Sequence, residues 1–296
     1  MRSVGSTLAR RTLGRQLTEF RKKAEISQAR AASVLGISPQ TMGRLEEGVS
    51  VRSASDLYMN TLCDRYGVSD ENRRTILALA REARTVARYG GGWWRPHLDR
   101  GPDDLDPRTV LDAAATQLTA WSVILLPAIV RTPDYVRAMA WTRFPNLPGD
   151  RIENYIEETT KQQRHLDDPG FSIEIFLSEA AIREEWGGPT VMAEQRKHLA
   201  EIGQRPNVSI RVMPFNSGSR IGALVGSFSL LEFPLLTQTR LTEPPIVYIE
   251  EHVGNLYLER SEEVACYKET IAELKRTALN ENDSRTVILA LSEDTA

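Results

Sequence analysis

A 22-residue segment near the start of the chain predicts two short helices with a tight turn between them. It runs from Ser27 to Gly48 and reads SQARAASVLGISPQTMGRLEEG. Gly36 can adopt, at little cost, the left-handed conformation that ends a helix, and Ile37 follows as an apolar plug between two steeply crossing helices. We therefore expect one helix before Gly36 and a second after Ile37.

Both helices carry capping and core signals. Ser27 and Ser38 are each placed to accept a hydrogen bond from an orphan amide at the start of a helix. Pro39 suits the first turn of the second helix, because its missing amide would be unpaired there. Apolar residues recur at helical spacing and are expected to face inward. They are Ala31, Ala32, Val34, Leu35, Met42 and Leu45.

The second helix leaves Gln40, Thr41 and Arg44 facing outward. In the major groove, glutamine can pair bidentately with adenine, arginine can pair with guanine, and a threonine methyl can touch a thymine methyl. The plainer alternative is that these are ordinary solvated side chains of a surface helix. In this frame of two capped helices, we interpret the segment as a DNA-reading helix-turn-helix whose partner is a double-stranded DNA operator.

From about Leu13 to about Gly67 the sequence resembles the phage-repressor-like, XRE-type helix-turn-helix regulators. The resemblance implies a mainly α domain of five helices in which Gln28 contacts the DNA backbone and supports base reading. It also implies that an arginine and a glutamate, here Arg21 and Glu46, form a structural ion pair.

The same resemblance implies that the first residues of the recognition helix face the bases. Pro39 is a departure that removes one side-chain contact, so base reading is expected to rest on Gln40, Thr41 and Arg44. The complete set of residues expected at the DNA is Gln28, Ser38, Pro39, Gln40, Thr41, Arg44, Arg52, Arg15 and Arg11.

Charge is divided unevenly along the chain. Residues 1–90 carry 16 Lys and Arg against 9 Asp and Glu, a net of +7, whereas the whole chain carries −3, which leaves −10 for residues 91–296. Only the N-terminal 90 residues carry the positive charge that binding to a polyanion such as DNA requires. Contacts with phosphates supply most of the non-specific affinity for DNA. A basic run is the expected clamp on the DNA backbone. It consists of Arg10, Arg11, Arg15, Lys22 and Arg52.

The length of 296 residues allows two domains with separate cores. We expect a helix-turn-helix domain at 1–88, a linker at 89–106 and a regulatory domain at 107–296. No stretch reaches the roughly 20 apolar residues of a membrane span, and the first residues lack the apolar core of a signal peptide, so we expect no membrane and a cytoplasmic location. Cys63 and Cys266 stand in no metal-like spacing, so neither a metal nor a cofactor is expected.

In the second domain helical patterns come first and strand patterns follow, which predicts an α+β domain with a mostly antiparallel sheet. The expected helices are 107–126, 133–143 capped by Thr132, 148–166, a helical stretch within 178–203, and 261–279. The expected strands, which alternate inward and outward residues, are 171–177, 207–213, 227–233 and 245–250. A short apolar run at 287–291 in the tail could dock on its own core or on a neighbouring chain, and we expect its own core.

Four segments of this half resemble the antitoxin-like domain, first catalogued as a domain of unknown function, that follows the helix-turn-helix in bacterial regulators of the Scr family. They are LLPAIVRTPDYVRAM at 125–139, SEAAIREEWGGPTVMAEQRKHL at 178–199, NVSIRVMPFNSG at 207–218 and GSFSLLEF at 226–233. The first usually reads P-G-L-L-Q-T, so residues 128–131 depart from the pattern. The resemblance implies a small partner protein encoded nearby.

Two functions stay open for this domain. One is a sensor of a partner or effector. Its binding changes operator affinity only as far as the partner prefers one arrangement of the two helix-turn-helix units over another. The other is an enzyme or small-ligand sensor, with the helix-turn-helix as a DNA tether. No spacing puts a nucleophile beside a base, so we expect no enzyme and no catalytic residue. The titratable residues from which an active site could be built are Glu179, Glu184, Glu185, His165, His198 and Asp167.

Helix-turn-helix proteins usually read two half-sites about one DNA turn apart, roughly 34 Å, as dimers. We therefore expect a homodimer.

Overall fold

The computed structural model describes residues 8–48, 54–85, 93–96, 107–112, 114–146, 148–218, 221–234, 244–251 and 254–293. By its contacts the chain divides into two compact units, one of residues 1–114, 233–246 and 251–264, the other of residues 115–232, 247–250 and 265–296. Since neither unit is a continuous segment, the domain limits expected from the sequence stay a prediction.

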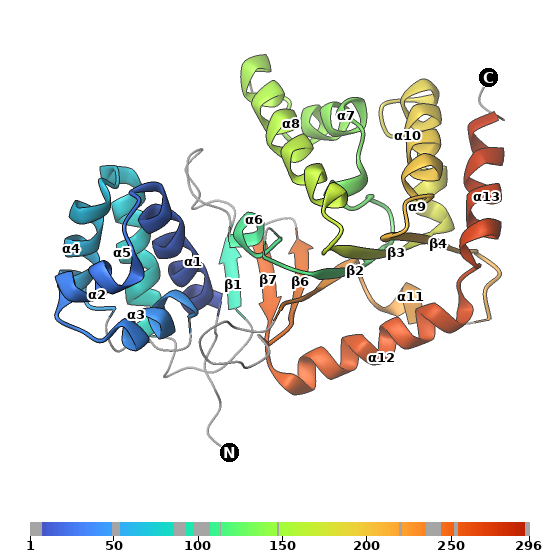
Figure 1. Cartoon of the computed structure of the whole chain (residues 1–296). Coiled ribbons are helices and arrows are strands. Elements are labelled where there is room, and N and C mark those ends of the chain that lie inside the picture. Colours follow the sequence, from blue (N-terminus) through green and yellow to red (C-terminus); the bar gives the residue numbers. More distant parts are fainter. Residues whose placement is uncertain are drawn as a thin grey trace. The chain divides into compact units, whose positions relative to one another are not determined.

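The first unit contains the five helices that the sequence predicts (Figure 1). They are α1 (Leu8–Lys23), α2 (Gln28–Leu35), α3 (Pro39–Glu46), α4 (Asp56–Tyr66) and α5 (Asp70–Thr85). Their shared core is built from apolar side chains that are fully removed from solvent, among them Leu13, Leu17, Met42, Met59 and Leu62. The mainly α helix-turn-helix fold is confirmed.

The predicted caps of α2 and α3 are confirmed. The Ser27 hydroxyl accepts a hydrogen bond from the amide of Arg30, and the Ser38 hydroxyl accepts one from the amide of Thr41. Gly36 ends α2 at φ +66°, in the left-handed region. Val34, expected in the core, is instead 39 % exposed, because it lies outside the stripe of α2 that Ala31, Ala32 and Leu35 bury.

The first unit also contains elements from later in the chain. Strand β1 (Trp93–Pro96) pairs antiparallel with β7 (Gly254–Leu258), and helix α6 (Pro107–Asp112) follows. A strand therefore lies within the segment that the sequence predicts to be a linker.

The strands of the second unit hydrogen-bond in the order β6-β5-β2-β3-β4. Their bounds are β2 (Gln117–Ser122), β3 (Ser172–Ser178), β4 (Val208–Met213), β5 (Phe228–Glu232) and β6 (Ile246–Glu251). Strand β2 is parallel to β3 and antiparallel to β5, and β3 is parallel to β4. The α+β class is confirmed, but the sheet is mixed where a mostly antiparallel one was expected. Helices connect β2 to β3 and β3 to β4, and such crossovers make neighbouring strands parallel.

The helix predicted over 107–126 is wrong beyond its start. Only α6 is helical there, and β2 follows it as a central strand between β5 and β3. Residues 118–122 are all buried, so the strand has no alternation of apolar and polar residues. A short apolar run of this kind cannot be told from a buried helix by periodicity.

The helices predicted at 133–143, 148–166, within 178–203 and at 261–279 are confirmed, whereas α11 and the helical form of the tail, α13, were not predicted. In Figure 1, α7, α8 and α10 lie on one side of β2, β3 and β4, and α12 lies on the other. Their bounds are α7 (Pro133–Arg143), α8 (Gly149–Gln163), α9 (Glu179–Arg183), α10 (Pro189–Ile202), α11 (Ile221–Leu224), α12 (Ser261–Thr277) and α13 (Glu281–Glu293), with short 3-10 turns η2 (Ala128–Val130) and η3 (Arg164–Asp167).

The tail docks on its own core, as predicted. It forms α13, in which Ile288 is 1 % exposed and whose Leu291 carbonyl accepts a hydrogen bond from Arg196 of α10.

Candidate nucleic-acid interface

One carboxylate fixes the position of the recognition helix α3. Glu46, in its last turn, accepts hydrogen bonds from Nε and Nη2 of Arg21 on α1, at 2.6 and 2.9 Å. The amide nitrogen of Gln28 on α2 donates to the same carboxylate at 2.8 Å. The side chains of Arg21 and Glu46 are only 12 % and 5 % exposed, and the hydrogen bond to Glu46 raises the pKa of Arg21. The predicted pair is confirmed, and it ties three helices together.

Helices α1 and α3 also approach closely at Gly14. A Cβ at this position would lie 2.2 Å from the backbone oxygen of Glu46. Only glycine allows this separation, so α3 is held against α1 both by the ion pair and by backbone contact.

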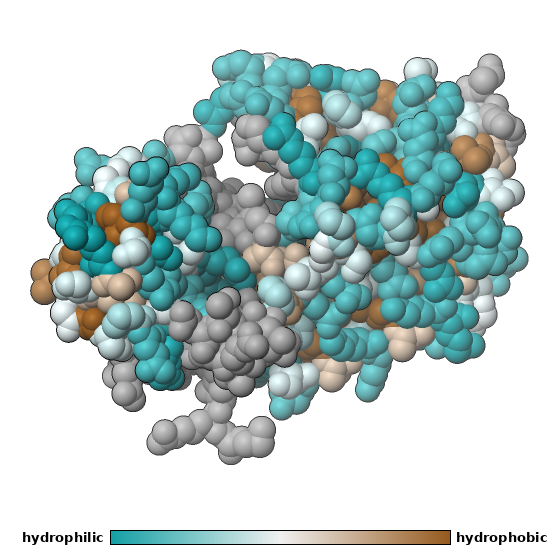
Figure 2. Space-filling view, in the orientation of Figure 1, coloured by the Kyte–Doolittle hydropathy of each residue, from teal (hydrophilic) through white to brown (hydrophobic). Residues whose placement is uncertain are grey.

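The residues expected to read bases lie along α3, from its N-cap Ser38 to Arg44 in its last turn. Ser38, Pro39, Gln40 and Arg44 are exposed, and Thr41 is half-buried. The hydroxyls of Ser38 and Thr41 are hydrogen-bonded to each other at 2.8 Å, which leaves the Thr41 methyl as its free group. The visible face of the five N-terminal helices is mostly hydrophilic, with some hydrophobic side chains among the polar ones (Figure 2). The side chains are available for major-groove contacts, which stay a prediction.

Gln28 has a role that the sequence did not predict. Its amide nitrogen is engaged with Glu46, so the side chain helps to orient α3. No local signal in the sequence reveals this bond, because it depends on the crossing of α2 and α3. A contact between Gln28 and DNA stays a prediction.

The structure places Arg11 and Arg15 differently from the phosphate clamp that we expected. Arg11 is 3 % exposed and donates to the carbonyl of Pro244 in the same unit. The guanidinium carbons of Arg11 and Arg15 lie 5.2 and 5.7 Å from the centre of the Phe233 ring. Charge counts in the sequence could not show this, because arginine also packs on aromatic rings.

The other members of the expected clamp differ from one another. Burial lowers the pKa of Arg10, against an opposing influence of Glu259. Lys22 is exposed and remains a candidate. Arg52 lies outside the described residues. Among the described members of the expected clamp, Lys22 is exposed and Arg15 is half-buried, and contacts of either with a phosphate stay a prediction.

The titratable residues that an enzyme would need are dispersed in the second unit. Glu179 accepts from the amide of Phe215, and Asp167 pairs with Arg205 at 2.7 Å. Glu185 pairs with the buried Arg196 at 2.8 Å. Each of these carboxylates serves a different structural contact, and the structure brings no nucleophile and base together from this set.

The two histidines of the set have different surroundings. His165 packs on Phe171 with ring centres 4.6 Å apart, and burial lowers the pKa of His198. Across the part of the chain that the structure describes, no group of three or more His, Cys, Asp or Glu can hold a metal ion. Nor is any helix there long and apolar enough to cross a membrane.

Comparison with known proteins finds two family models, one for each half of the chain. Residues 12–76 match a family model described as a helix-turn-helix domain. Residues 107–290 match a family model described as a domain of unknown function, DUF5753. Neither the curated proteins nor the solved structures contain a match. The second model spans more than half of the chain, and the chain therefore belongs to the DUF5753 family, with a helix-turn-helix domain in front of the family's domain.

Proposed function

We propose that this protein is a sequence-specific DNA-binding transcriptional regulator of the XRE type. The observation that carries the proposal is the exposed face of α3, where Gln40 and Arg44 stand on a helix oriented by the Glu46 network. Donor and acceptor groups on a rigid helix are what base readout requires, since one misplaced side chain loses a bidentate contact.

The protein is proposed to act as a homodimer in the cytoplasm. Two copies of α3 would enter successive turns of the major groove, about 34 Å apart. A dimer also doubles the number of base contacts, which raises the preference for an operator over random DNA.

The second unit is proposed to bind a small partner protein or effector in an antitoxin-like arrangement. Support comes from the resemblance of its segments to the Scr-family domain and from the net charge of −10 on residues 91–296, which does not suit DNA. Such binding changes operator affinity only by the difference in the partner's affinity for the two states of the regulator. Glu179, Asp167 and Glu185 are each engaged in a different structural contact, which favours this sensor over an enzyme.

The test is a titration of the full chain against the DNA upstream of its own gene and against random DNA. It is run at two salt concentrations, with and without the small protein encoded next to it. We expect tight binding to the upstream DNA, weaker and more salt-dependent binding to random DNA, and a shift on addition of the partner. Equal, weak binding to both DNAs would reject the proposal.

A further inference from the structure

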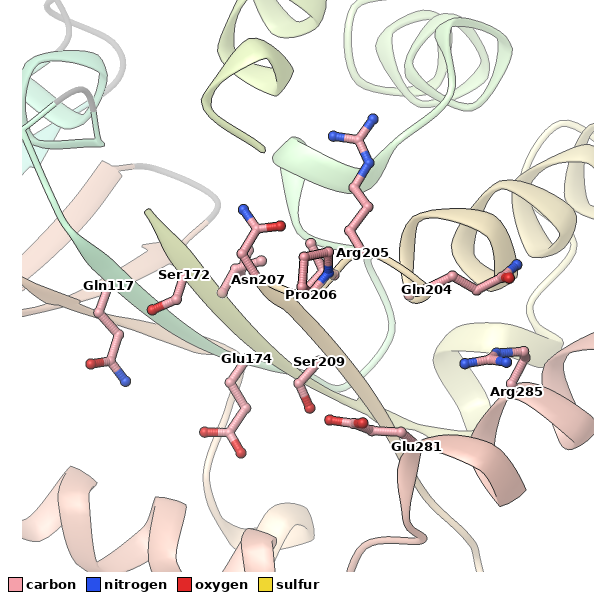
Figure 3. Close-up of a pocket in the computed structure, with 13 residues that line it drawn as sticks. Gln117, Ser172, Glu174, Gln204, Arg205, Pro206, Asn207, Ser209, Glu281 and Arg285 are labelled. Atoms are coloured by element: carbon pink, nitrogen blue, oxygen red, sulfur yellow. The ribbon is translucent and has the colours of Figure 1, made fainter. Parts of the chain in front are cut away.

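A polar hollow of about 590 Å³ opens in the second unit at the amino ends of three neighbouring strands (Figure 3). Gln117, Ser172 and Val208, which begin β2, β3 and β4, all line it. Its volume falls in the range of roughly 300–1,000 Å³ that is typical of small-molecule sites. Most of those sites are mainly apolar, whereas polar side chains dominate here, so the hollow suits a small polar molecule.

The floor of the hollow is one face of the sheet. Gln117 is in register with Ser172, and Glu174 is in register with Ser209, so these side chains point to the same side. Residues between them, such as Ile173, point to the other side and are buried. Glu174 is paired with Lys275 of α12 at 2.6 Å, which marks where α12 covers the face and the hollow begins.

One wall of the hollow is the first part of α13, and its position is fixed. The amide of Leu279 donates to the carbonyl of Val212 on the edge strand β4, and the amide of Val212 donates to the hydroxyl of Ser284, both at 2.9 Å. Arg211 donates to the carbonyl of Leu279 at 2.9 Å. Residues on the first turns of α13 are therefore held in place before any ligand binds.

Two opposite charges on this wall are open to the hollow. Glu281 and Arg285 both line it and stand four residues apart on α13, a spacing at which such side chains commonly pair. Within the described part of the chain, neither side chain forms an ion pair or a hydrogen bond. Figure 3 shows Glu281 pointing toward Ser209 and Glu174, whereas Arg205 points away.

We propose that this hollow binds a small zwitterion, a free α-amino acid. The guanidinium of Arg285 would take the ligand carboxylate, for which arginine offers a bidentate fork. The Glu281 carboxylate, next to Glu174, would take the ammonium group. Side chains four apart on a helix begin about 5–6 Å from each other, which suits a ligand that carries both charges on one carbon. The floor hydroxyls of Ser172 and Ser209 face the remaining polar groups. This inference does not depend on DNA binding.

The test is calorimetric titration of the full chain with each of the twenty common amino acids at millimolar concentration. The best binder is then retested as its N-acetyl and carboxamide derivatives. We expect one or a few amino acids to bind and both blocked derivatives to bind about tenfold or more weakly, because each has lost one charge-assisted contact.

Two variants assign the contacts. Arg285→Gln and Glu281→Gln remove no ion pair or hydrogen bond among the described residues, so both should fold, and each should weaken binding about tenfold or more. Arg276→Gln is the matched control: it removes another helical arginine, paired with Glu273 at 2.7 Å and outside the hollow, and should leave affinity unchanged. The N-acetyl derivative should no longer distinguish Glu281→Gln from the wild type.

Either of two results would overturn the proposal. One is the absence of measurable binding by all twenty amino acids. The other is binding that neither Arg285→Gln nor Glu281→Gln weakens, since the ligand would then sit elsewhere on the protein. Failure of the DNA titrations would leave this result untouched, because amino-acid binding is measured without DNA.

Discussion

The guanidinium of Arg21 and the carboxylate of Glu46 form a bidentate pair, at 2.6 and 2.9 Å, at the junction of α1 and α3. Gln28 donates to the same carboxylate, so Glu46 satisfies partners from two other helices. The pair lies behind the helix that we propose to read DNA, and its effect on DNA binding is therefore indirect.

Glu46→Leu should lower the free energy of unfolding by about 3–5 kcal/mol, because it leaves the largely buried Arg21 charge unpaired. The double variant Arg21→Met, Glu46→Leu should recover a large part of this loss, since no buried charge is then left alone. Denaturant unfolding measures both. A double variant less stable than Glu46→Leu would show that the pair itself contributes the stability.

Gly14→Ala should destabilise the first unit by about 1–3 kcal/mol or more, the usual cost of overpacking. The new Cβ would lie 2.2 Å from the Glu46 carbonyl oxygen, which is backbone and cannot turn away. Gly149→Ala, where nothing lies within 4 Å of the added Cβ, is the matched control and should be close to neutral. Thermal unfolding of the two variants separates steric contact from a general effect of losing glycine.

Gln195→Leu should destabilise the second unit, because Gln195 is fully buried and bridges two backbone groups of the loop before α7. Its Oε1 accepts from the Thr132 amide at 2.7 Å, and its Nε2 donates to the Val130 carbonyl at 2.8 Å. Each group left unpaired costs about 1–3 kcal/mol. The exposed Gln204→Leu is the control. Equal unfolding midpoints for the two variants would show that the loop does not need this bridge.

Cys63 should resist alkylation at pH 8 while Cys266 reacts. Cys63 is fully buried and Cys266 is exposed, and burial raises the pKa of the Cys63 thiol to about 11. The neutral thiol is thus favoured in the folded state, so this group's contribution to stability is lost as the pH rises from about 9 toward 11. Mass spectrometry after iodoacetamide treatment, with Cys266→Ser as the single-cysteine control, measures the protection. Rapid labelling of native Cys63 would contradict it.

Local signals predicted the elements that local physics determines. Thr132 and Pro133 mark the start of α7, and the structure confirms both the cap and the helix. Ser27, Gly36 and Ser38 set the helix-turn-helix in the same way. In each case the capping bond or the backbone conformation involves residues within four positions of one another.

Features that depend on distant pairing could not be predicted. Strand β2 is buried on both faces, so its residues show no period that separates strand from helix. Likewise, the sequence shows Arg11 and Arg15 only as basic residues near the helix-turn-helix. Their contact with the Phe233 ring joins residues more than 200 positions apart, and no local pattern predicts it. The hollow next to α13 is built from four separate segments, and no motif joins them.

The most direct test of the account is the ratio of operator affinity to random-DNA affinity for Gln40→Ala and Arg44→Ala. Base reading predicts that each variant loses roughly 1–3 kcal/mol on the operator and little on random DNA. Arg52→Ala should weaken both DNAs, and Arg74→Ala on the exposed face of α5 should weaken neither. Equal losses on the two DNAs for Gln40→Ala and Arg44→Ala would contradict base reading by α3.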